Sequence, residues 1–357
     1  MVKCIETGDE ALKDLFKGLL SSGAVDGLIL PQRAGKSVIY TLVTDPGKVK
    51  DPAIFAPSFG FNAANILRKW LIEDKVLGLV FKPCEARATI ELIKLEQINP
   101  DAILLISVDC PGTFKNEDYT ANTDEIGDKL TDEIKSKLSE KGVEVRAACT
   151  MCETKLGEIG DIGIWHMGLG STTVVALSEK GEAALSKVEG ITLGDKDIDR
   201  SSLQSEIKSA AESGREALKK ELESLNDPLK LLDVLNDCIV CKNCRDICPV
   251  CYCKECFFEQ SLGNPRGGDL LNIANTRGDV RIPPYGLFYH LTRAYHVCVT
   301  CIGCGACEDA CPKGIPLTLI YPVVARNVQD LFEYVPGMDL EEPIPLTTYQ
   351  EDELEPR

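Results

Sequence analysis

Apolar residues in the first half of the chain occur in short runs that alternate with segments of helical spacing. The runs are rich in Val, Ile and Leu and end at turn residues, a pattern that predicts strands. Helices are expected between several of them, notably over residues 85–97 and 124–141. Alternating strands and helices are typical of an α/β domain with an at least partly parallel sheet. The expected strands are residues 25–32, 37–45, 76–84, 103–110, 143–149, 161–168 and 171–179.

The pattern changes near residue 195, and the chain divides into four predicted parts. Residues 1–195 form the α/β domain, and residues 196–228 contain a polar helix that we interpret as a solvated linker. A cysteine-rich domain follows over residues 229–320. Residues 321–357 form an acidic tail. From Arg326 onward this tail holds 9 acidic and 2 basic residues, so we expect it to be extended or partly disordered.

The overall charge and hydropathy exclude two broad classes of protein. The net charge of −17 argues against a nucleic-acid binder, whose affinity comes largely from Lys and Arg on phosphates. No apolar run approaches the roughly 18–20 residues that a membrane-spanning helix needs. The first residues lack the basic segment and apolar stretch of a secretory signal. We therefore expect a cytoplasmic protein with no membrane span.

The cysteine content points to metal. The chain has 17 cysteines, an odd number, and a chain of 357 residues needs no disulfides to supplement a small core. Twelve of the 17 lie within residues 238–311. In a reducing compartment, so dense a cluster is most simply explained by iron–sulfur centres.

A repeated motif defines two of these centres. The pattern C-x2-C-x2-C-x3-C-P occurs twice, and three thiolates on one such loop can bind three irons of a cubane. The fourth cysteine, next to proline, ligates the other cluster in two-cluster ferredoxins. We therefore expect two [4Fe–4S] clusters with crossed ligation. Zinc is disfavoured, because its sites usually pair two short hooks. The first set of ligands is Cys238, Cys241, Cys244 and Cys311, and the second is Cys301, Cys304, Cys307 and Cys248.

The 52 residues between the two motifs exceed the linker of small bacterial ferredoxins. This spacing resembles the α-helical ferredoxin modules of fumarate reductase and heterodisulfide reductase. His290 and His296 lie between the motifs at near-helical spacing, on a helix face that we expect against the second cluster. Four further cysteines either line the domain as free thiols or bind an additional cluster. They are Cys251, Cys253, Cys256 and Cys298.

Four scattered cysteines in the first block suggest a third centre. Cys84 and Cys110 stand at predicted strand ends, and Cys149 and Cys152 follow another predicted strand. Because the carboxyl ends of parallel strands meet at one edge of a sheet, all four could converge there. The alternative is four separate buried thiols.

The contexts of these cysteines, KPCEAR, VDCPG and ACTMC, are followed by GEIGDIGIWHMGLGSTTVVALSEKG. Over about residues 10–190 the chain thereby resembles the β-subunit family of coenzyme F420-reducing hydrogenase and F420-dependent formate dehydrogenase. The resemblance implies that Cys84, Cys110, Cys149 and Cys152 bind a [4Fe–4S] cluster beside FAD. It also implies that the flavin exchanges a hydride with the deazaflavin coenzyme.

One segment departs from the family pattern. The family's glycine-pair loop, which helps to seat the flavin, is replaced here by Gly8-Asp9-Glu10, whose carboxylates would repel a pyrophosphate. A later segment could still offer backbone N–H groups to phosphate, or it could be an ordinary turn between two strands. It comprises Gly168, Gly170, Ser171 and Thr172.

Together, the sequence predicts an α/β domain followed by a mostly α-helical two-cluster ferredoxin domain, with three [4Fe–4S] clusters or four. The leading hypothesis is an electron-transfer oxidoreductase subunit. The resemblances imply as partners a formate dehydrogenase or hydrogenase catalytic subunit, or heterodisulfide reductase-type subunits. The competing hypothesis is a flavin-free subunit that passes electrons and has no substrate of its own.

Overall fold

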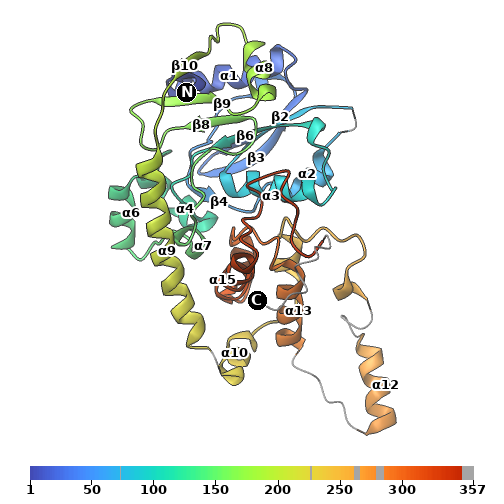
Figure 1. Ribbon diagram of the computed structural model, residues 1–357. Coiled ribbons are helices and arrows are strands. Elements are labelled where there is room, and N and C mark those ends of the chain that lie inside the picture. Colours follow the sequence, from blue (N-terminus) through green and yellow to red (C-terminus); the bar gives the residue numbers. More distant parts are fainter. Residues whose placement is uncertain (73, 226, 261–265, 279–284, 348–357) are drawn as a thin grey trace.

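The computed structural model describes residues 1–72, 74–225, 227–260, 266–278 and 285–347. It contains an N-terminal α/β region followed by a helical region, which confirms the expected fold class (Figure 1). The α/β region is built on an eight-stranded sheet. In spatial order its strands are β10 (Gly194–Lys196), β1 (Val2–Thr7), β9 (Thr172–Ala176), β8 (Ile162–Trp165), β6 (Ile103–Val108), β5 (Leu77–Phe81), β2 (Gly27–Ala34) and β3 (Ser37–Val43).

The centre of the sheet is parallel and both of its sides are antiparallel. The pairs β2–β5, β5–β6 and β6–β8 are parallel. Central strands read as continuous apolar runs because both faces are covered. On β5, Leu79 and Phe81 pack toward α2 (Ala64–Trp70) and α3 (Pro83–Lys94). Val80 faces the other side, where α1 (Asp9–Ser21) and α8 (Glu179–Ser186) cover the sheet.

Two local expectations for the α/β region were wrong. The expected strand over residues 143–149 is absent from the described structure, where the chain instead enters the short helix α7 (Ala147–Thr150). Val143 and Val145 do pack inward, against a small core that includes Phe114 and Leu138, so their apolar alternation reflects burial without a strand partner. The expected helix over 124–141 is two helices, α5 (Thr123–Ile126) and α6 (Asp132–Ser139). Near them, α4 (Asn116–Ala121) follows β7 (Phe114–Lys115), which pairs with β4 (Ser58–Phe59).

The helix expected to be a solvated linker, α9 (Ser201–Glu223), is in part a packing element (Figure 1). It contacts α7 and α15 (Leu317–Leu331), and Ile207 and Ala211 are buried on its inner side. At Gly214 the approach to α7 is so close that a Cβ would lie 2.4 Å from the carbonyl oxygen of Thr150. One face of the linker therefore binds the two regions together, while its remaining faces are solvated.

The cysteine-rich region is helical. Its elements are α10 (Pro228–Leu235), α11 (Asn243–Asp246), η3 (Phe257–Glu259), α12 (Gly267–Arg277), α13 (Tyr285–Val297), α14 (Ala306–Asp309) and α15. Apolar residues of this region, among them Leu235 and Tyr289, share one core with α2, α3 and the sheet. Since the two regions share a core, the ferredoxin-like part is packed directly against α2 and α3.

The segment expected to be an acidic tail from residue 321 is largely packed. Residues up to Leu331 complete α15, and the following stretch returns to the α/β region. There Tyr334 is buried and donates a hydrogen bond to the buried carboxylate of Glu91 on α3, while the backbone N–H of Gly337 donates to the same carboxylate at 2.8 Å. The acidic composition led us to expect an extended or disordered tail. A few buried residues are nevertheless enough to hold an otherwise acidic segment against the α/β region. The remainder of the expected tail, 348–357, lies outside the described residues.

Candidate iron–sulfur centres

Four thiols from the α/β region line one cavity. Cys84 lies in the first turn of α3, directly after β5, and Cys110 follows the neighbouring parallel strand β6. Cys149 on α7 and Cys152 just beyond it complete the set, together with backbone and side chains of the ferredoxin-like region at Cys301 and Cys304. We call this space the N-terminal cavity. Burial raises the pKa of the Cys84 thiol and raises that of Cys110 to about 12, so an iron cluster would have to supply the stabilisation of their thiolates.

Buried cations surround the N-terminal cavity. Arg87 is 7% exposed, and the acceptors of its guanidinium among the described residues are neutral: the carbonyl oxygens of Pro336 at 2.7 Å and Ile302 at 3.4 Å, and the hydroxyl of Thr154 at 3.0 Å. Glu153 and Glu91 act on it electrostatically without accepting a hydrogen bond from it, as do the thiols of Cys152 and Cys84. A buried guanidinium costs several kcal/mol unless anions near it compensate its charge. A cluster held by four thiolates is such an anion.

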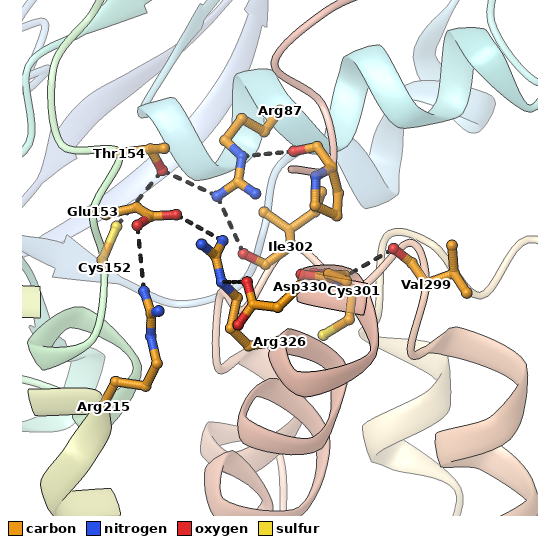
Figure 2. Close-up of polar contacts among 12 residues, drawn as sticks. Arg87, Cys152, Glu153, Thr154, Arg215, Val299, Cys301, Ile302, Arg326 and Asp330 are labelled. Atoms are coloured by element: carbon orange, nitrogen blue, oxygen red, sulfur yellow. Dashed lines mark hydrogen bonds and ion pairs between the residues drawn. The ribbon is translucent and has the colours of Figure 1, made fainter. Parts of the chain in front are cut away.

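Ion pairs among residues that line the same cavity join three segments of the chain (Figure 2). Glu153, next to Cys152, accepts from Arg326 of α15 at 2.7 Å and from Arg215 of α9 at 3.3 Å. Arg326 also pairs with Asp330 one turn further along α15. The segment after α7 and the helices α9 and α15 are therefore held together at the wall of the cavity.

The ferredoxin-like region contains two further cavities, and their cysteines are exchanged as the repeated motif predicts. Cys311 lies with the three cysteines of the first loop, in what we call the outer cavity. Cys248 lies with the three cysteines of the second loop, in what we call the middle cavity. The thiols of the outer cavity are Cys238, Cys241, Cys244 and Cys311, and those of the middle cavity are Cys248, Cys301, Cys304 and Cys307.

The two loops have the same backbone geometry. Val240 and Lys242 in the first loop, like Gly303 and Gly305 at the equivalent places in the second, have φ between 50° and 75°. Val240 and Lys242 adopt this left-handed conformation although it is disfavoured for residues with a Cβ, and such strain is typical of functional loops. It turns a backbone N–H toward sulfur: that of Val240 lies 3.4 Å from Sγ of Cys238.

Helix α13 faces the outer cavity with polar side chains. Nε2 of His290 lies 3.2 Å from Sγ of Cys238, and the hydroxyl of Tyr289 lies 3.4 Å from Sγ of Cys244. Burial, together with the charge of Arg293, lowers the pKa of His290 to about 4, so the imidazole is neutral. We expected His290 and His296 against the second cluster, and this was wrong. His290 contacts the first loop, and the exposed His296 packs beside the rings of Phe257 and Phe258.

The donor sets suit cubane clusters better than single metal ions. The outer and middle cavities are each lined by four thiols, the ligand set of a [4Fe–4S] cluster. The N-terminal cavity is lined by four thiols of the α/β region and, in addition, by Cys301 and Cys304 of the middle cavity. Among the residues that the structure describes, no three Cys, His, Asp or Glu side chains are grouped as one metal ion would require. All 17 cysteines are described, and none forms a disulfide.

The remaining four cysteines of the region have different surroundings. Cys251 contacts the thiol of Cys248 at the middle cavity, and Cys256 lies beside Arg245. Cys253 is exposed, and Sγ of Cys298 lies 3.6 Å from the carbonyl oxygen of Tyr295. Nothing in the described structure assembles them into a fourth site, and we propose none.

The place expected for a flavin phosphate is filled by a side chain. Gly168, Gly170 and Ser171 form the turn between β8 and β9, and Thr172 begins β9. The hydroxyl of Thr172 donates at 2.6 Å to the carboxylate of Asp9, the first residue of α1, which also pairs with Lys129 at 2.7 Å. A helix N-terminus attracts anions, but here Asp9 already supplies one. A pyrophosphate would meet this carboxylate, so the residues present do not fit FAD at this position.

Comparison with known proteins agrees with this geometry. Residues 233–315 match the 4Fe-4S dicluster domain, and residues 74–199 match the C terminus of the coenzyme F420 hydrogenase/dehydrogenase beta subunit. The beta subunit of F420-dependent formate dehydrogenase from Methanocaldococcus jannaschii is 31% identical, with 92% of each chain covered. The chain belongs to the F420 hydrogenase/dehydrogenase beta-subunit family. The resemblance seen in the sequence is thereby confirmed.

One further beta subunit and one solved structure also match. The beta subunit of F420-dependent formate dehydrogenase 1 from Methanococcus maripaludis is 27% identical, covering 93% of this chain and 92% of that protein. A chain of the F420-reducing [NiFe] hydrogenase complex from Methanosarcina barkeri has a TM-score of 0.45 and 14% identity, over 61% of this chain and 90% of that one. Among the described residues, no helix of this family member has the length and apolar character needed to cross a membrane.

Proposed function

We propose that the chain is an iron–sulfur electron-transfer subunit that holds three [4Fe–4S] clusters in a row. The observation that carries this proposal is the position of Cys304, which lines both the N-terminal cavity and the middle cavity. The two cavities are therefore neighbours. The outer cavity is joined to the middle one through the exchanged cysteines Cys248 and Cys311.

The row has a buried end and an accessible end. The N-terminal cavity lies against the sheet and behind the ion pairs of Glu153. At the outer cavity, Cys241 is exposed, and the side chain of Ile239 beside it is 63% exposed. An exposed ligand allows another redox protein to come close to the cluster that it would hold. We assign the outer cavity as the contact point for such a partner.

The relatives indicate the class of partner. Both are named as beta subunits of F420-dependent formate dehydrogenase, so we propose a formate dehydrogenase or hydrogenase catalytic subunit. A heterodisulfide reductase-type subunit is a further partner that the helical ferredoxin resemblance suggests. Cubane clusters, when bound, carry single electrons and make no bonds to substrate. The chain's own residues hold the clusters, exclude water and set the spacing between them.

We further propose that this chain works without FAD and does not itself react with the deazaflavin coenzyme. This form of the hypothesis rests on the carboxylate of Asp9, held by Thr172 and Lys129 where the flavin phosphate would bind. Electrons then enter and leave only through partner proteins. The N-terminal cavity would serve as one stop of the relay.

Anaerobic spectroscopy tests both parts of this proposal. The purified chain should contain iron and acid-labile sulfide but no flavin, and reduced deazaflavin or NADH alone should leave the cluster absorbance unchanged. Adding formate together with a formate dehydrogenase catalytic subunit should bleach it. Rapid bleaching by reduced deazaflavin alone would overturn the flavin-free form. Failure of the formate, hydrogenase and heterodisulfide reductase partners alike to exchange electrons with the clusters would overturn the relay.

A further inference from the structure

Helix α13 presents two side chains, one turn apart, to two different cavities. His290 faces the outer cavity, as described above, and Arg293 lines the middle cavity. Residues three apart on a helix lie on the same face, so one face of α13 spans both cavities. The guanidinium of Arg293 carries a permanent positive charge.

Arg293 is buried without a carboxylate partner. It is 1% exposed, and its Nε and Nη1 atoms have no hydrogen-bond partner among the described residues. The guanidinium carbon lies 4.1 Å above the ring of Tyr321, which is a weak interaction beside the cost of burying a charge. The titratable groups near it are Tyr321, three thiols of the middle cavity and their neighbour Cys251, and, toward the outer cavity, Cys244, Tyr289 and His290. The three thiols are Cys248, Cys301 and Cys307. The arginine is therefore aimed at the place of an anionic cluster.

We propose that Arg293 sets the reduction potential of the cluster in the middle cavity and makes it the more easily reduced of the two ferredoxin clusters. This inference rests on the proposed function. Reduction adds one negative charge to a cluster, and a fixed positive charge in a site shielded from water stabilises that product strongly. At the outer cavity, α13 contributes the imidazole of His290 and the hydroxyl of Tyr289, and Arg293 is the one Arg or Lys in this helix. Arg293 is thus a positioning residue: through its charge it determines which of the two ferredoxin clusters is reduced first.

A redox titration of the full-length anaerobic protein, followed by electron paramagnetic resonance, tests this role. Arg293→Gln should shift the midpoint potential of one cluster to more negative values and leave the other potentials in place. Arg293→Lys should restore most of the shift. Lys313→Gln is the matched control: it also removes a positive charge beside a cluster, but Lys313 is exposed at the outer cavity, where solvent screens it. An unshifted potential in Arg293→Gln with full iron content would overturn the proposal.

A second pair of variants keeps the arginine in place, in case its loss prevents cluster binding. Cys251→Asp would bring a carboxylate next to Arg293 and neutralise its charge, whereas Cys251→Ser would not. The aspartate variant should shift the same cluster to more negative potential, and the serine variant should not; equal potentials in both would contradict the proposal. Failure of the wild-type chain to hold two ferredoxin clusters would instead contradict the proposed function. The two failures are therefore distinguishable.

Discussion

The guanidinium of Arg146, on the α/β side, donates a 2.7 Å hydrogen bond to the carbonyl oxygen of Cys304 on the ferredoxin side. The same side chain pairs with Asp309, stacks over Phe59 with its carbon 3.9 Å from the ring centroid, and reaches within 3.9 Å of Sγ of Cys149. One arginine thus contacts a ligand loop of the N-terminal cavity and a ligand loop of the middle cavity. It therefore holds the N-terminal cavity and the middle cavity at a fixed separation.

Removing this arginine should loosen the two loops. Arg146→Met leaves Asp309 without its partner, and breaking a buried ion pair costs about 3–5 kcal/mol. We expect faster hydrogen exchange at residues 303–309 and slower electron transfer between the N-terminal and middle clusters. Arg215→Met is the control, because its partly exposed pair with Glu153 should contribute about 1 kcal/mol or less. Equal exchange in the two variants would contradict the role of Arg146.

The iron content should be about 12 atoms per chain, four for each of three cubane clusters. Cys110→Ala should lower it by about four and leave the spectra of the two ferredoxin clusters intact. Cys4→Ser should keep the full content, since Cys4 packs in a separate small core with Trp165 and Val175. Elemental analysis decides the matter. About eight atoms in the wild type would refute the N-terminal cluster. About 16 would refute the statement that Cys251, Cys253, Cys256 and Cys298 bind no fourth cluster.

Crossed ligation can be tested by replacing the last cysteine of either motif. Cys311→Ala should damage the cluster of the outer cavity, although Cys311 belongs to the second motif, and Cys248→Ala should damage that of the middle cavity. The physical reason is that each sulfur faces the cavity of the other loop. Paramagnetic resonance of the two variants, each compared with the wild type, gives the assignment. Loss of the cluster on the same loop in both variants would refute the crossing.

The interaction of the Asp9 carboxylate with Lys129 and Thr172 should make a small, pH-dependent contribution to the free energy of unfolding. Burial raises the pKa of this carboxyl, but the hydrogen bonds from Lys129 and Thr172 outweigh it, and the net shift is downward. A depressed pKa stabilises the fold above the unfolded-state pKa of about 4, and the contribution disappears as the pH falls through the folded pKa. Because the side chain is about half exposed, solvent screening keeps the contribution below about 1 kcal/mol.

Urea unfolding of the wild type and of Asp9→Asn, compared at each pH, measures this contribution. Both proteins lose iron in acid, so the difference between them isolates the carboxylate. It should be constant between pH 7 and pH 5 and vanish below about pH 4. A difference that persists unchanged in acid would show that Asp9 acts through shape and not through charge.

The sequence predicted features that depend on local spacing. The exchange of Cys248 and Cys311 follows from a repeated motif whose loop geometry is set within a few residues. The positions of Cys84 and Cys110 beside each other follow from two parallel strands that end at the same edge of a sheet. These inferences needed only the period of a strand and the length of a loop.

Features that depend on packing between distant segments could not be predicted. Helical spacing shows that His290 and Arg293 share a face, but it does not show which cavity each would meet. Tyr334 and Gly337 look like parts of an acidic tail until Glu91 is seen, buried and in need of donors. Residues 143–149 have the alternation of a strand, yet Val143 and Val145 pack against the small core around Phe114, away from the sheet.

The shared lining of the N-terminal cavity has a consequence for biosynthesis. Cys84, Cys110, Cys149 and Cys152 are made before Ile302, Cys304 and Arg326, which complete the walls of their cavity. A chain that has not yet reached these later residues lacks part of the cavity wall. A cluster in the N-terminal cavity should therefore be inserted only after the ferredoxin-like region has been synthesised and has packed against the α/β region.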